Sequence, residues 1–262
     1  MLAAYANSID FGNPLAGLVV GEVADPVVPA GWTTVTMKAA SLNHHDLWSL
    51  RGIGLPADRL PMTLGCDAAG IDEQGNEVVV YTVVSDAPFG TDETIDESRS
   101  ILSEKFPGTF SERFSIPARN LIAKPTNWSW AEAACLPTAW LTAYRMLAVR
   151  SGLRPGNTVL VQGAGGGVAT ACIALGAAMG FRVWATSRDE EKRARALELG
   201  AHDVFESGAR LPDRVDAVME TVGEATWEHS VKCLKPGGTI VISGATSGPN
   251  PPAQLTRIFF KQ

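Results

Sequence analysis

The chain has 262 residues, of which 45% are hydrophobic and 19% are charged, the balance of a soluble globular protein long enough for two domains. Its net charge of −6, without any cluster of lysine and arginine, excludes the basic surface that a nucleic-acid partner requires. No apolar run approaches the length of a membrane span, and the first residues lack the features of a signal peptide. We therefore expect a cytoplasmic protein with no membrane partner.

The first part of the chain is predicted to be mostly β. Short runs of β-forming residues alternate with glycine and proline turns, at 18–23, 32–39, 78–84 and 110–116. One segment, from Asn43 to Leu50, is predicted to form a short helix. The stretch from Ser85 to Thr109 is polar and acidic, which favours a surface loop or a lid over a place in the core.

The pattern changes after Lys124-Pro125, where we place the boundary between a domain over 1–124 and a second over 125–262. From Ser129 to Leu147 apolar residues recur at helical spacing, interrupted at Pro137. Strands and helices then alternate, with strands predicted at 159–162, 182–186, 203–205, 215–220 and 239–243 and helices at 168–179, 189–199 and 224–234. This alternation predicts an α/β domain with a parallel, doubly wound sheet, whose ligand lies at the carboxyl ends of the strands. Lys235 to Gly238 is predicted to be a turn, and the chain ends at Gln262 in an apolar run without a cap.

A glycine-rich turn follows the strand that ends at Gln162. Four glycines there let the backbone approach a phosphate, and the positive end of the next helix favours the anion. We therefore predict that this turn binds a dinucleotide through Gly163, Ala164, Gly165, Gly166, Gly167 and Val168. A turn of purely structural role is the alternative reading of the glycines alone.

The residues at the end of the next strand predict which cofactor binds. A carboxylate at this position reads the ribose of NAD and repels a 2′-phosphate, whereas here the position is Ser187, followed by Arg188. A guanidinium suits a phosphate, and Lys192 lies one turn further on. The sequence thus favours NADP (NADPH), although both cations could simply be solvated at the start of a helix. Val222, Ser243 and Gly244 also lie at strand ends and are predicted to contact the cofactor.

Several motifs in order resemble the medium-chain dehydrogenase/reductase superfamily, in particular its zinc-independent quinone oxidoreductases. They include AASLNHHDLWSLRG (39–52), LGCDAAG (64–70), GTFSERFSIPARNL (108–121), AACLPTAWLTAY (133–144), VQGAGGGVA (161–169) and LKPGGTIVISG (234–244). The resemblance implies a GroES-like β-rich catalytic domain followed by a Rossmann domain, with the active site in the cleft between them. It also implies a sixth sheet strand that often pairs across a homodimer, so we expect this sequence to be truncated at its C-terminus.

The resemblance also implies the roles of individual residues. Zinc-dependent relatives hold their metal at the positions of Asn43, Cys66 and Thr138, of which only Cys66 is a good ligand, so we predict that the protein carries no metal. His44, His45, Asp46 and Asp67 lie nearby in the sequence, but adjacent side chains such as His44 and His45 rarely converge on one ion. Asn43 is expected near the nicotinamide and the substrate oxygen. Of its neighbours, His44 is expected to touch the cofactor phosphate, His45 to lie where relatives have a proton relay, and Asp46 to orient neighbouring groups. Thr138 and Val222 are expected to pack against the cofactor.

These expectations together predict an NADPH-dependent oxidoreductase. Its substrate would be a small quinone or an α,β-unsaturated carbonyl compound, because hydride transfer to these acceptors needs orientation and hydrogen-bond donors rather than a metal. An alcohol or aldehyde dehydrogenase of the same fold is one alternative. A non-catalytic NADPH-binding protein is another, since fold alone does not establish function.

Overall fold

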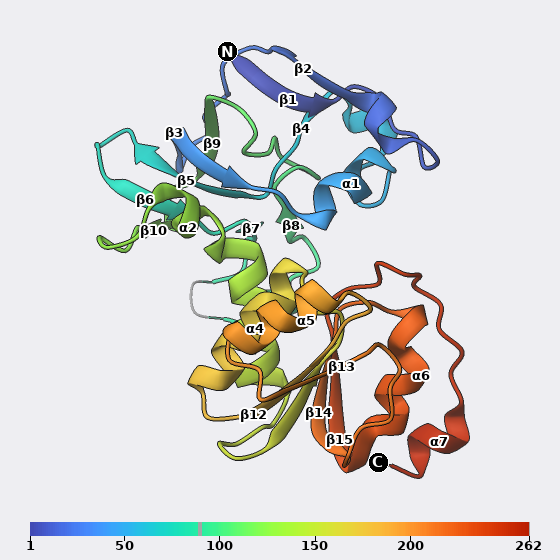
Figure 1. Ribbon diagram of the computed structural model, residues 1–262. Coiled ribbons are helices and arrows are strands. Elements are labelled where there is room, and N and C mark those ends of the chain that lie inside the picture. The colour runs from blue at the N-terminus through green and yellow to red at the C-terminus, as the bar shows by residue number, and fades with distance from the viewer. Residues whose placement is uncertain (89–90, 262) are drawn as a thin grey trace. The chain divides into compact units, whose positions relative to one another are not determined.

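A computed structural model describes residues 1–88 and 91–261, which form two compact units, Met1–Thr138 and Ala139–Gln262. In Figure 1 the first unit is coloured from blue to green and the second from green through yellow to red. The division falls after the predicted boundary at Lys124-Pro125, because helix α2 (Trp130–Ala134) packs on strands of the first unit.

The first unit is built on antiparallel sheets. A five-stranded sheet has the order β10-β6-β5-β3-β9, a three-stranded sheet has the order β2-β1-β4, and β7 pairs with β8. The strands are β1 (Leu2–Ala6), β2 (Leu18–Glu22), β3 (Trp32–Ser41), β4 (Met62–Thr63), β5 (Asp67–Asp72), β6 (Glu77–Val80), β7 (Val83–Val84), β8 (Ser100–Ile101), β9 (Arg113–Pro117) and β10 (Leu121–Ala123). The β-rich character predicted from the sequence is confirmed, and the run predicted at 78–84 is divided between β6 and β7.

Helices are short in this unit. The predicted helix at 43–50 is confirmed as α1 (His44–Leu50), and 3₁₀ turns lie at Pro14–Gly17, Ala57–Arg59, Glu93–Ile95 and Ala118–Asn120. The helical stretch predicted from Ser129 is also confirmed. It runs through α2, a π-helical turn (Leu136–Trp140) that contains Pro137, α3 (Leu141–Tyr144) and a second π-helical turn (Arg145–Arg150). The wider π turn accommodates the proline without ending the helical path.

The prediction of a surface loop over 85–109 is wrong for its second half. Ser100 and Ile101 form β8, and Leu102 is fully buried in a cluster with Val80, Phe114 and Ile116. Ser103 and Thr109 are fully buried as well. Two apolar residues of this acidic stretch anchor it to the sheet: Leu102 lies in the cluster and Phe106 packs against it. Residues 89–90 of this prediction lie outside the described residues.

The second unit contains the predicted parallel sheet, in the order β13-β12-β11-β14-β15. Its strands are β11 (Thr158–Val161), β12 (Arg182–Thr186), β13 (Asp203–Phe205), β14 (Val215–Glu220) and β15 (Leu234–Ile242). Its further helices are α4 (Gly167–Ala178), α5 (Glu190–Glu198), α6 (Glu224–Cys233) and α7 (Leu255–Phe259). Two predictions are corrected. Lys235–Gly238 belongs to β15 rather than to a separate turn, and the first three residues of the final run, Arg257–Phe259, belong to α7, while Gln262 lies outside the described residues.

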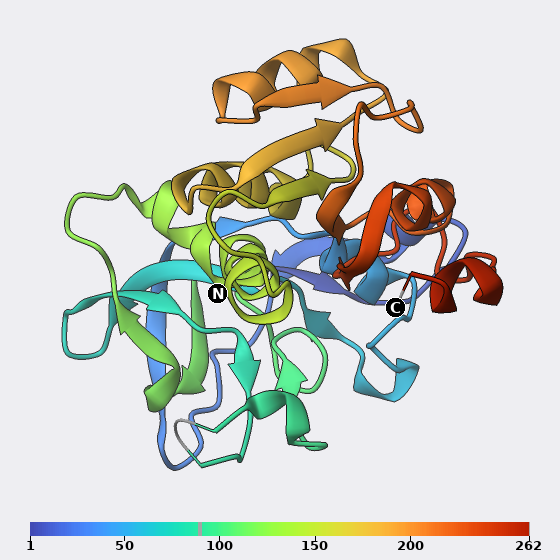
Figure 2. The same cartoon turned by 90° about the horizontal axis from the view of Figure 1, so that it is seen from below.

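Both faces of this sheet are covered. Successive strand residues point to opposite faces, so Val159 and Val161 pack with Ile173 of α4, whereas Leu160 packs in a second cluster with Cys233 at the end of α6. α6 and α7 lie side by side (Figure 2). The result is the three-layer arrangement expected of a doubly wound domain, with the carboxyl ends of all its strands at one edge of the sheet.

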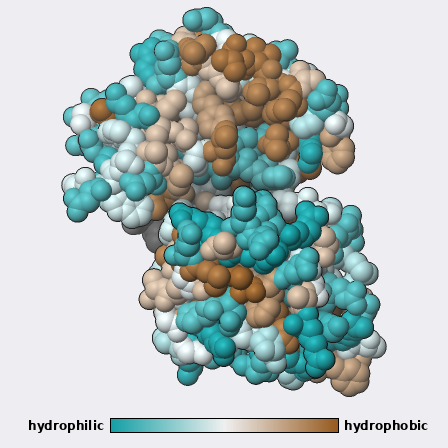
Figure 3. All heavy atoms as spheres, viewed as in Figure 1, coloured by the Kyte–Doolittle hydropathy of each residue, from teal (hydrophilic) through white to brown (hydrophobic). Residues whose placement is uncertain are grey.

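Apolar side chains are exposed on the first unit around β1 and β2 (Figure 3). They include Leu2, Leu15, Leu18 and Val20. Of the helices in the described part of the chain, none is long and apolar enough to cross a membrane.

Asp216 joins three strands at the amino-terminal end of the parallel sheet. Its carboxylate accepts hydrogen bonds from the Thr158 amide at 2.8 Å and from Lys235 Nζ at 2.9 Å. Burial raises the pKa of Asp216, but the bonds from Lys235 and Thr158 outweigh burial and hold that pKa below its usual value.

A lowered pKa in the folded state stabilises the fold above the unfolded pKa and stops doing so as pH falls through the folded value. Asp216→Asn is therefore expected to destabilise the protein at pH 7 and to have a smaller effect at about pH 3, below the ordinary aspartate pKa. Urea unfolding at both pH values measures this difference. Asp213→Asn, at an exposed position nearby, is the control. An equal loss for Asp216→Asn at both pH values would contradict the expectation.

Candidate functional site

The glycine turn between β11 and α4 has the conformation that a phosphate-binding loop needs. Gly163 and Gly165 have φ values of +75° and +112°, which other residues rarely adopt. A Cβ atom on Gly163 would lie 2.5 Å from Val222 Cγ2, and one on Gly165 would lie 2.6 Å from Lys192 Cδ. A Cβ atom on Gly166 would meet nothing within 4 Å. Gly163 and Gly165 therefore pack closely against neighbouring side chains, whereas the space beside Gly166 is free of atoms of the described residues.

Neighbouring strand ends converge on this turn. The Ala164 amide donates to the Thr186 carbonyl at 2.8 Å, which brings the turn beside the end of β12 and Ser187. Ser187 is buried, and its carbonyl accepts a hydrogen bond from Arg193 Nη1 at 2.7 Å. Arg188 is exposed, and the stem of Lys192 lies over Gly165. Two of the three predicted ribose-reading residues, Ser187 and Lys192, thus lie beside the glycine turn.

Further predicted cofactor residues lie at the carboxyl ends of β14 and β15. Glu220 is fully buried and accepts hydrogen bonds from the Val222 and Gly223 amides and from the hydroxyls of Thr226 and Ser230. The Ser243 amide donates to the Glu220 carbonyl at 3.0 Å. Gly244 approaches the backbone of Thr221 so closely that a Cβ atom would lie 2.6 Å from its carbonyl oxygen. Glu220 holds Val222 in place, and we did not predict this role from the sequence.

The N-terminus of α4 fits a dinucleotide. Gly166 occupies the N-cap position of this 12-residue helix and supplies no side-chain cap, so the amides of the first turn are left for another acceptor. Gly167 and Val168 are the first two residues of the helix. These amides and the close approach at Gly165 would hold the pyrophosphate of a nicotinamide cofactor.

In the first unit, predicted site residues meet at the carboxylate of Asp67. Asp67 is fully buried and accepts hydrogen bonds from Ser41 Oγ at 2.7 Å, Asn43 Nδ2 at 2.8 Å and Thr138 Oγ1 at 2.5 Å. Burial raises the pKa of Asp67, although the bonds from Thr138, Asn43 and Ser41 oppose this effect. We call this group the Asp67 network. It positions Asn43 and Thr138, which are far apart in the sequence.

The other predicted residues of this unit lie on α1. Asp46 is buried and its Oδ2 accepts a hydrogen bond from the Asn43 amide at 2.8 Å, so it fixes the backbone beside the Asn43 side chain. Burial raises the pKa of Asp46, with the bond from Asn43 opposing. His44 is exposed and contacts the edge of Trp48, with ring centroids 5.4 Å apart. The structure therefore brings Asn43, Asp46 and Thr138 together and leaves His44 at the surface.

His45 has partners on both ring nitrogens. Nε2 lies 3.0 Å from Glu104 Oε1, and Nδ1 lies 3.2 Å from Cys66 Sγ and 3.4 Å from Ser103 Oγ. Burial raises the pKa of the Cys66 thiol, and the nearby Asp46 and Asp67 carboxylates add to the effect. Neither Ser103 nor Glu104 was predicted, because both lie in the segment expected to be a surface loop.

Comparison with known proteins agrees with this architecture. Residues 29–126 match the alcohol dehydrogenase GroES-like domain, and residues 167–262 match the zinc-binding dehydrogenase family. An acryloyl-coenzyme A reductase of Metallosphaera sedula is 34% identical over 87% of this chain and 73% of its own length. The chain belongs to the medium-chain dehydrogenase/reductase superfamily. It is an oxidoreductase of this superfamily, with a GroES-like domain and a Rossmann domain.

Two solved structures extend the comparison. An NAD-dependent alcohol dehydrogenase is 32% identical, with a TM-score of 0.91, and the match covers 100% of this chain and 82% of that chain. A quinone oxidoreductase of Thermus thermophilus, solved also as its NADPH complex, is 29% identical, with a TM-score of 0.78, and the match covers 100% of this chain and 78% of that chain. Nicotinamide cofactors thus bind to proteins of this fold.

The catalytic zinc that the family name implies does not fit the residues at the corresponding positions of this chain. The amide of Asn43 and the hydroxyl of Thr138 are both hydrogen-bonded to Asp67. Cys66 Sγ faces His45, and Cys66 is only 1% exposed. A catalytic zinc requires three good ligands and an open position, and these three residues do not provide them.

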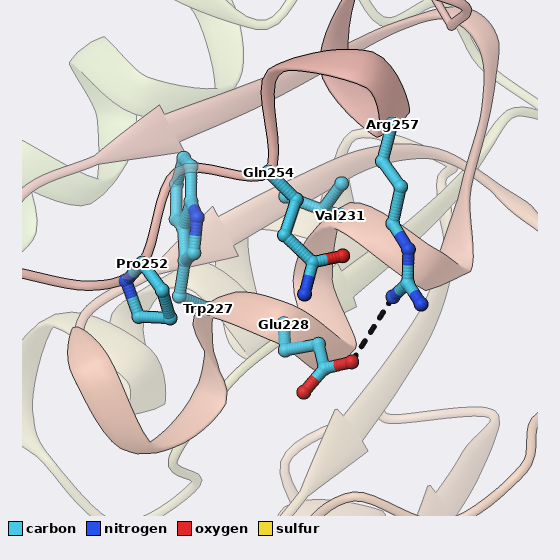
Figure 4. Close-up of a pocket in the computed structure, with 6 residues that line it drawn as sticks. All are labelled: Trp227, Glu228, Val231, Pro252, Gln254 and Arg257. Carbon is cyan, nitrogen blue, oxygen red and sulfur yellow. Dashed lines mark hydrogen bonds and ion pairs between the residues drawn. The ribbon is translucent and has the colours of Figure 1, made fainter.

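A shallow pocket elsewhere in the second unit lies between α6 and α7 (Figure 4). Its lining residues are Trp227, Glu228, Val231, Pro252, Gln254 and Arg257, and Arg257 Nη1 lies 3.0 Å from Glu228 Oε1. None of the predicted cofactor residues lines it.

Proposed function

We propose that this protein transfers hydride from NADPH to a quinone or an α,β-unsaturated carbonyl compound, without a catalytic metal. The observation that carries the proposal is the Asp67 network, in which a buried carboxylate engages Asn43 and Thr138 at positions where zinc-dependent relatives hold their metal. The names of the relatives support the substrate class, since one reduces acryloyl-coenzyme A and another is a quinone oxidoreductase.

NADPH supplies the hydride in this reaction. The Asn43 amide has two hydrogens and donates one of them to Asp67 Oδ2, which fixes the orientation of the side chain. The second hydrogen is available to the carbonyl oxygen of the substrate, on which negative charge develops as hydride arrives at the conjugated carbon. A donor held in place in this way stabilises the developing charge without reorganisation. Asp46 supports this arrangement by accepting a hydrogen bond from the backbone N–H of Asn43.

Thr138 donates its hydroxyl hydrogen to Asp67, so its oxygen is left as an acceptor for the cofactor. In the second unit, the Val222 amide is held by Glu220, and the Val222 side chain remains a predicted cofactor contact. The predicted roles of His44 at the cofactor phosphate and of His45 in proton transfer remain predictions from the sequence. So do the homodimer, which would pair through a strand added beside β15, and the cytoplasmic location.

Cofactor oxidation tests the proposed function. Purified protein is mixed with NADPH and a panel of quinones, enones and enoyl-coenzyme A esters, and the loss of NADPH absorbance is followed. Turnover with members of this panel, and none of simple alcohols with NADP⁺, is the expected result. Alcohol oxidation would favour the alcohol dehydrogenase alternative. Tight NADPH binding with no turnover of any compound would favour the non-catalytic alternative.

The preference for NADPH rests on Ser187, Arg188 and Lys192, with no carboxylate at the position that reads the ribose. A charge-assisted hydrogen bond contributes about 1.5–3 kcal/mol, and each ~1.4 kcal/mol is a factor of ten in affinity. Arg188→Ala is therefore expected to weaken NADPH binding by about ten- to a hundredfold and NADH binding little. Fluorescence titration of both cofactors measures this difference. Equal losses, or a wild-type preference for NADH, would show that Arg188 does not read the phosphate.

A further inference from the structure

A buried polar network lies next to the glycine turn of the second unit. Gln162, the residue before Gly163, is fully buried, and its side-chain amide has partners at both the nitrogen and the oxygen. Its Nε2 lies 2.9 Å from His229 Nδ1 and 3.0 Å from Ser230 Oγ, both on α6. Its Oε1 accepts a hydrogen bond from Thr186 Oγ1 at 2.5 Å. We call Gln162, Thr186, His229 and Ser230 the Gln162 network.

The surroundings of His229 fix the orientation of the Gln162 amide. His229 Nε2 lies 2.8 Å from the Ala209 carbonyl oxygen, and because a carbonyl can only accept, Nε2 carries the hydrogen of the neutral imidazole. Cys233 Sγ, 3.2 Å from the same nitrogen, is then a second, weak acceptor. Nδ1 is left as the acceptor of the ring. The NH₂ group of Gln162, rather than its oxygen, therefore faces His229.

Ser230 and Thr186 are satisfied by the same orientation. The Ser230 hydroxyl donates to Glu220 Oε2 at 2.6 Å, which leaves its oxygen to accept the second hydrogen of the Gln162 amide. Thr186 supplies a hydrogen to the amide oxygen. Thr186, Glu220 and Ser230 are all fully buried. A buried network in which the polar groups are paired favours one arrangement, because any other leaves a polar group without a partner in the interior.

The Gln162 network is connected to the glycine turn through the backbone. Thr186 binds Gln162 with its hydroxyl, and its carbonyl oxygen accepts a hydrogen bond from the Ala164 amide of the turn at 2.8 Å. The carbonyl oxygen of Gln162 accepts a hydrogen bond at 3.1 Å from Oγ1 of Thr221, which directly follows β14. The network therefore holds together the ends of β11, β12 and β14, from which the turn begins.

We propose that Gln162 is a positioning residue for the nicotinamide cofactor. Its amide holds the glycine turn in the conformation that receives the pyrophosphate, and Gln162 acts from the interior without touching the cofactor. This role rests on the proposed function, in which the turn binds NADPH. The affinity for a ligand falls in proportion to the fraction of the protein in the binding conformation. A turn that is less firmly held should therefore bind NADPH and NADH more weakly, and by the same factor.

Replacing Gln162 by methionine tests this role. Methionine has a similar length and no amide, so the variant fills the same space and loses three hydrogen bonds. We expect the dissociation constants of NADPH and NADH to rise equally, by about tenfold or more, the combined net effect of three ordinary hydrogen bonds. Fluorescence titration measures both constants. Hydrogen exchange at the Ala164 amide, followed by NMR without cofactor, should also be faster in the variant.

A pair of variants at Thr186 keeps the test decisive if Gln162→Met does not fold. Thr186→Val has the same shape but lacks the hydroxyl, so Gln162 Oε1 loses its partner. Both cofactors should then bind about two- to tenfold more weakly. Thr186→Ser retains the hydroxyl and should retain the wild-type affinity. This difference assigns the effect to the hydrogen bond rather than to a change in size.

Ser151→Ala is the control for lost stability alone. Ser151 is buried in the same unit, before the start of β11, and its hydroxyl donates to the Leu147 carbonyl oxygen at 2.5 Å. This variant should unfold at lower urea concentration and bind both cofactors normally. Unchanged affinity in Gln162→Met and Thr186→Val, an equal loss in Ser151→Ala, or a loss for NADPH alone would overturn the role of Gln162. Absence of cofactor binding by the wild-type protein would instead overturn the proposed function, and this role with it.

Discussion

Replacing Asn43 by alanine is expected to lower kcat/KM for reduction of a quinone or enone by about 10²- to 10³-fold, the effect of removing one positioned donor from a developing oxyanion. The dissociation constant of NADPH should change little, because the proposed partner of Asn43 is the substrate oxygen rather than the cofactor phosphates. Steady-state kinetics and a cofactor titration on the same preparation separate these two effects.

Ser41→Ala is the matched control for this variant. Ser41 also donates to Asp67 Oδ2, at 2.7 Å, but it is not assigned to the substrate. The Ser41→Ala variant therefore removes one hydrogen-bond donor from the Asp67 network and leaves the side-chain amide of Asn43 in place. A small change for Ser41→Ala beside a large loss for Asn43→Ala supports the assignment. Losses of similar size would show that disturbance of Asp67 is the cause.

The parts of the fold that were predicted from the sequence are those with strong local signals. The strand before Gly163, the glycine turn and α4 follow directly from an apolar run, four glycines and a helical segment. β5 was missed because its sequence, DAAGID, has low β propensity. Its small residues have a packing reason, since a Cβ atom on Gly70 would lie 2.3 Å from the Thr36 carbonyl oxygen on β3. Contacts of this kind between distant segments leave no periodic pattern in the sequence.

The same distinction applies to the candidate site. The predicted residues of the second unit are brought together because strand ends in a parallel sheet meet at one edge, a rule that needs only the order of elements. The Asp67 network joins positions 41, 43, 67 and 138, and side-chain contacts join His45 to Ser103 and Glu104. Their pairing depends on how α1, β5 and the segment after β8 pack, which local patterns do not specify. In addition, the acidic composition of 85–109 predicted a surface loop, and Ser103 and Glu104 were therefore not predicted as site residues.

Gly165→Ala is expected to weaken the binding of NADPH and NADH alike, by about a hundredfold or more. A methyl group on a residue with φ of +112° would move the turn and its amides away from the pyrophosphate that both cofactors share. Losing two charge-assisted hydrogen bonds of about 1.5–3 kcal/mol each predicts a loss of this size. Arg188→Ala, in contrast, should affect NADPH alone, so the two variants separate phosphate recognition by the turn from recognition at the ribose.

Gly156→Ala is the control for the backbone effect. Gly156 also has positive φ, at +90°, lies just before β11 and has open space where a Cβ atom would be. Forcing alanine into the left-handed region costs about 1–2 kcal/mol, so both variants should lose stability of that order in urea unfolding. Only Gly165→Ala should lose cofactor affinity, because Gly156 lies at the opposite end of the strand from the turn. Unchanged cofactor binding in Gly165→Ala, or an equal loss in Gly156→Ala, would show that the glycine turn does not hold the pyrophosphate.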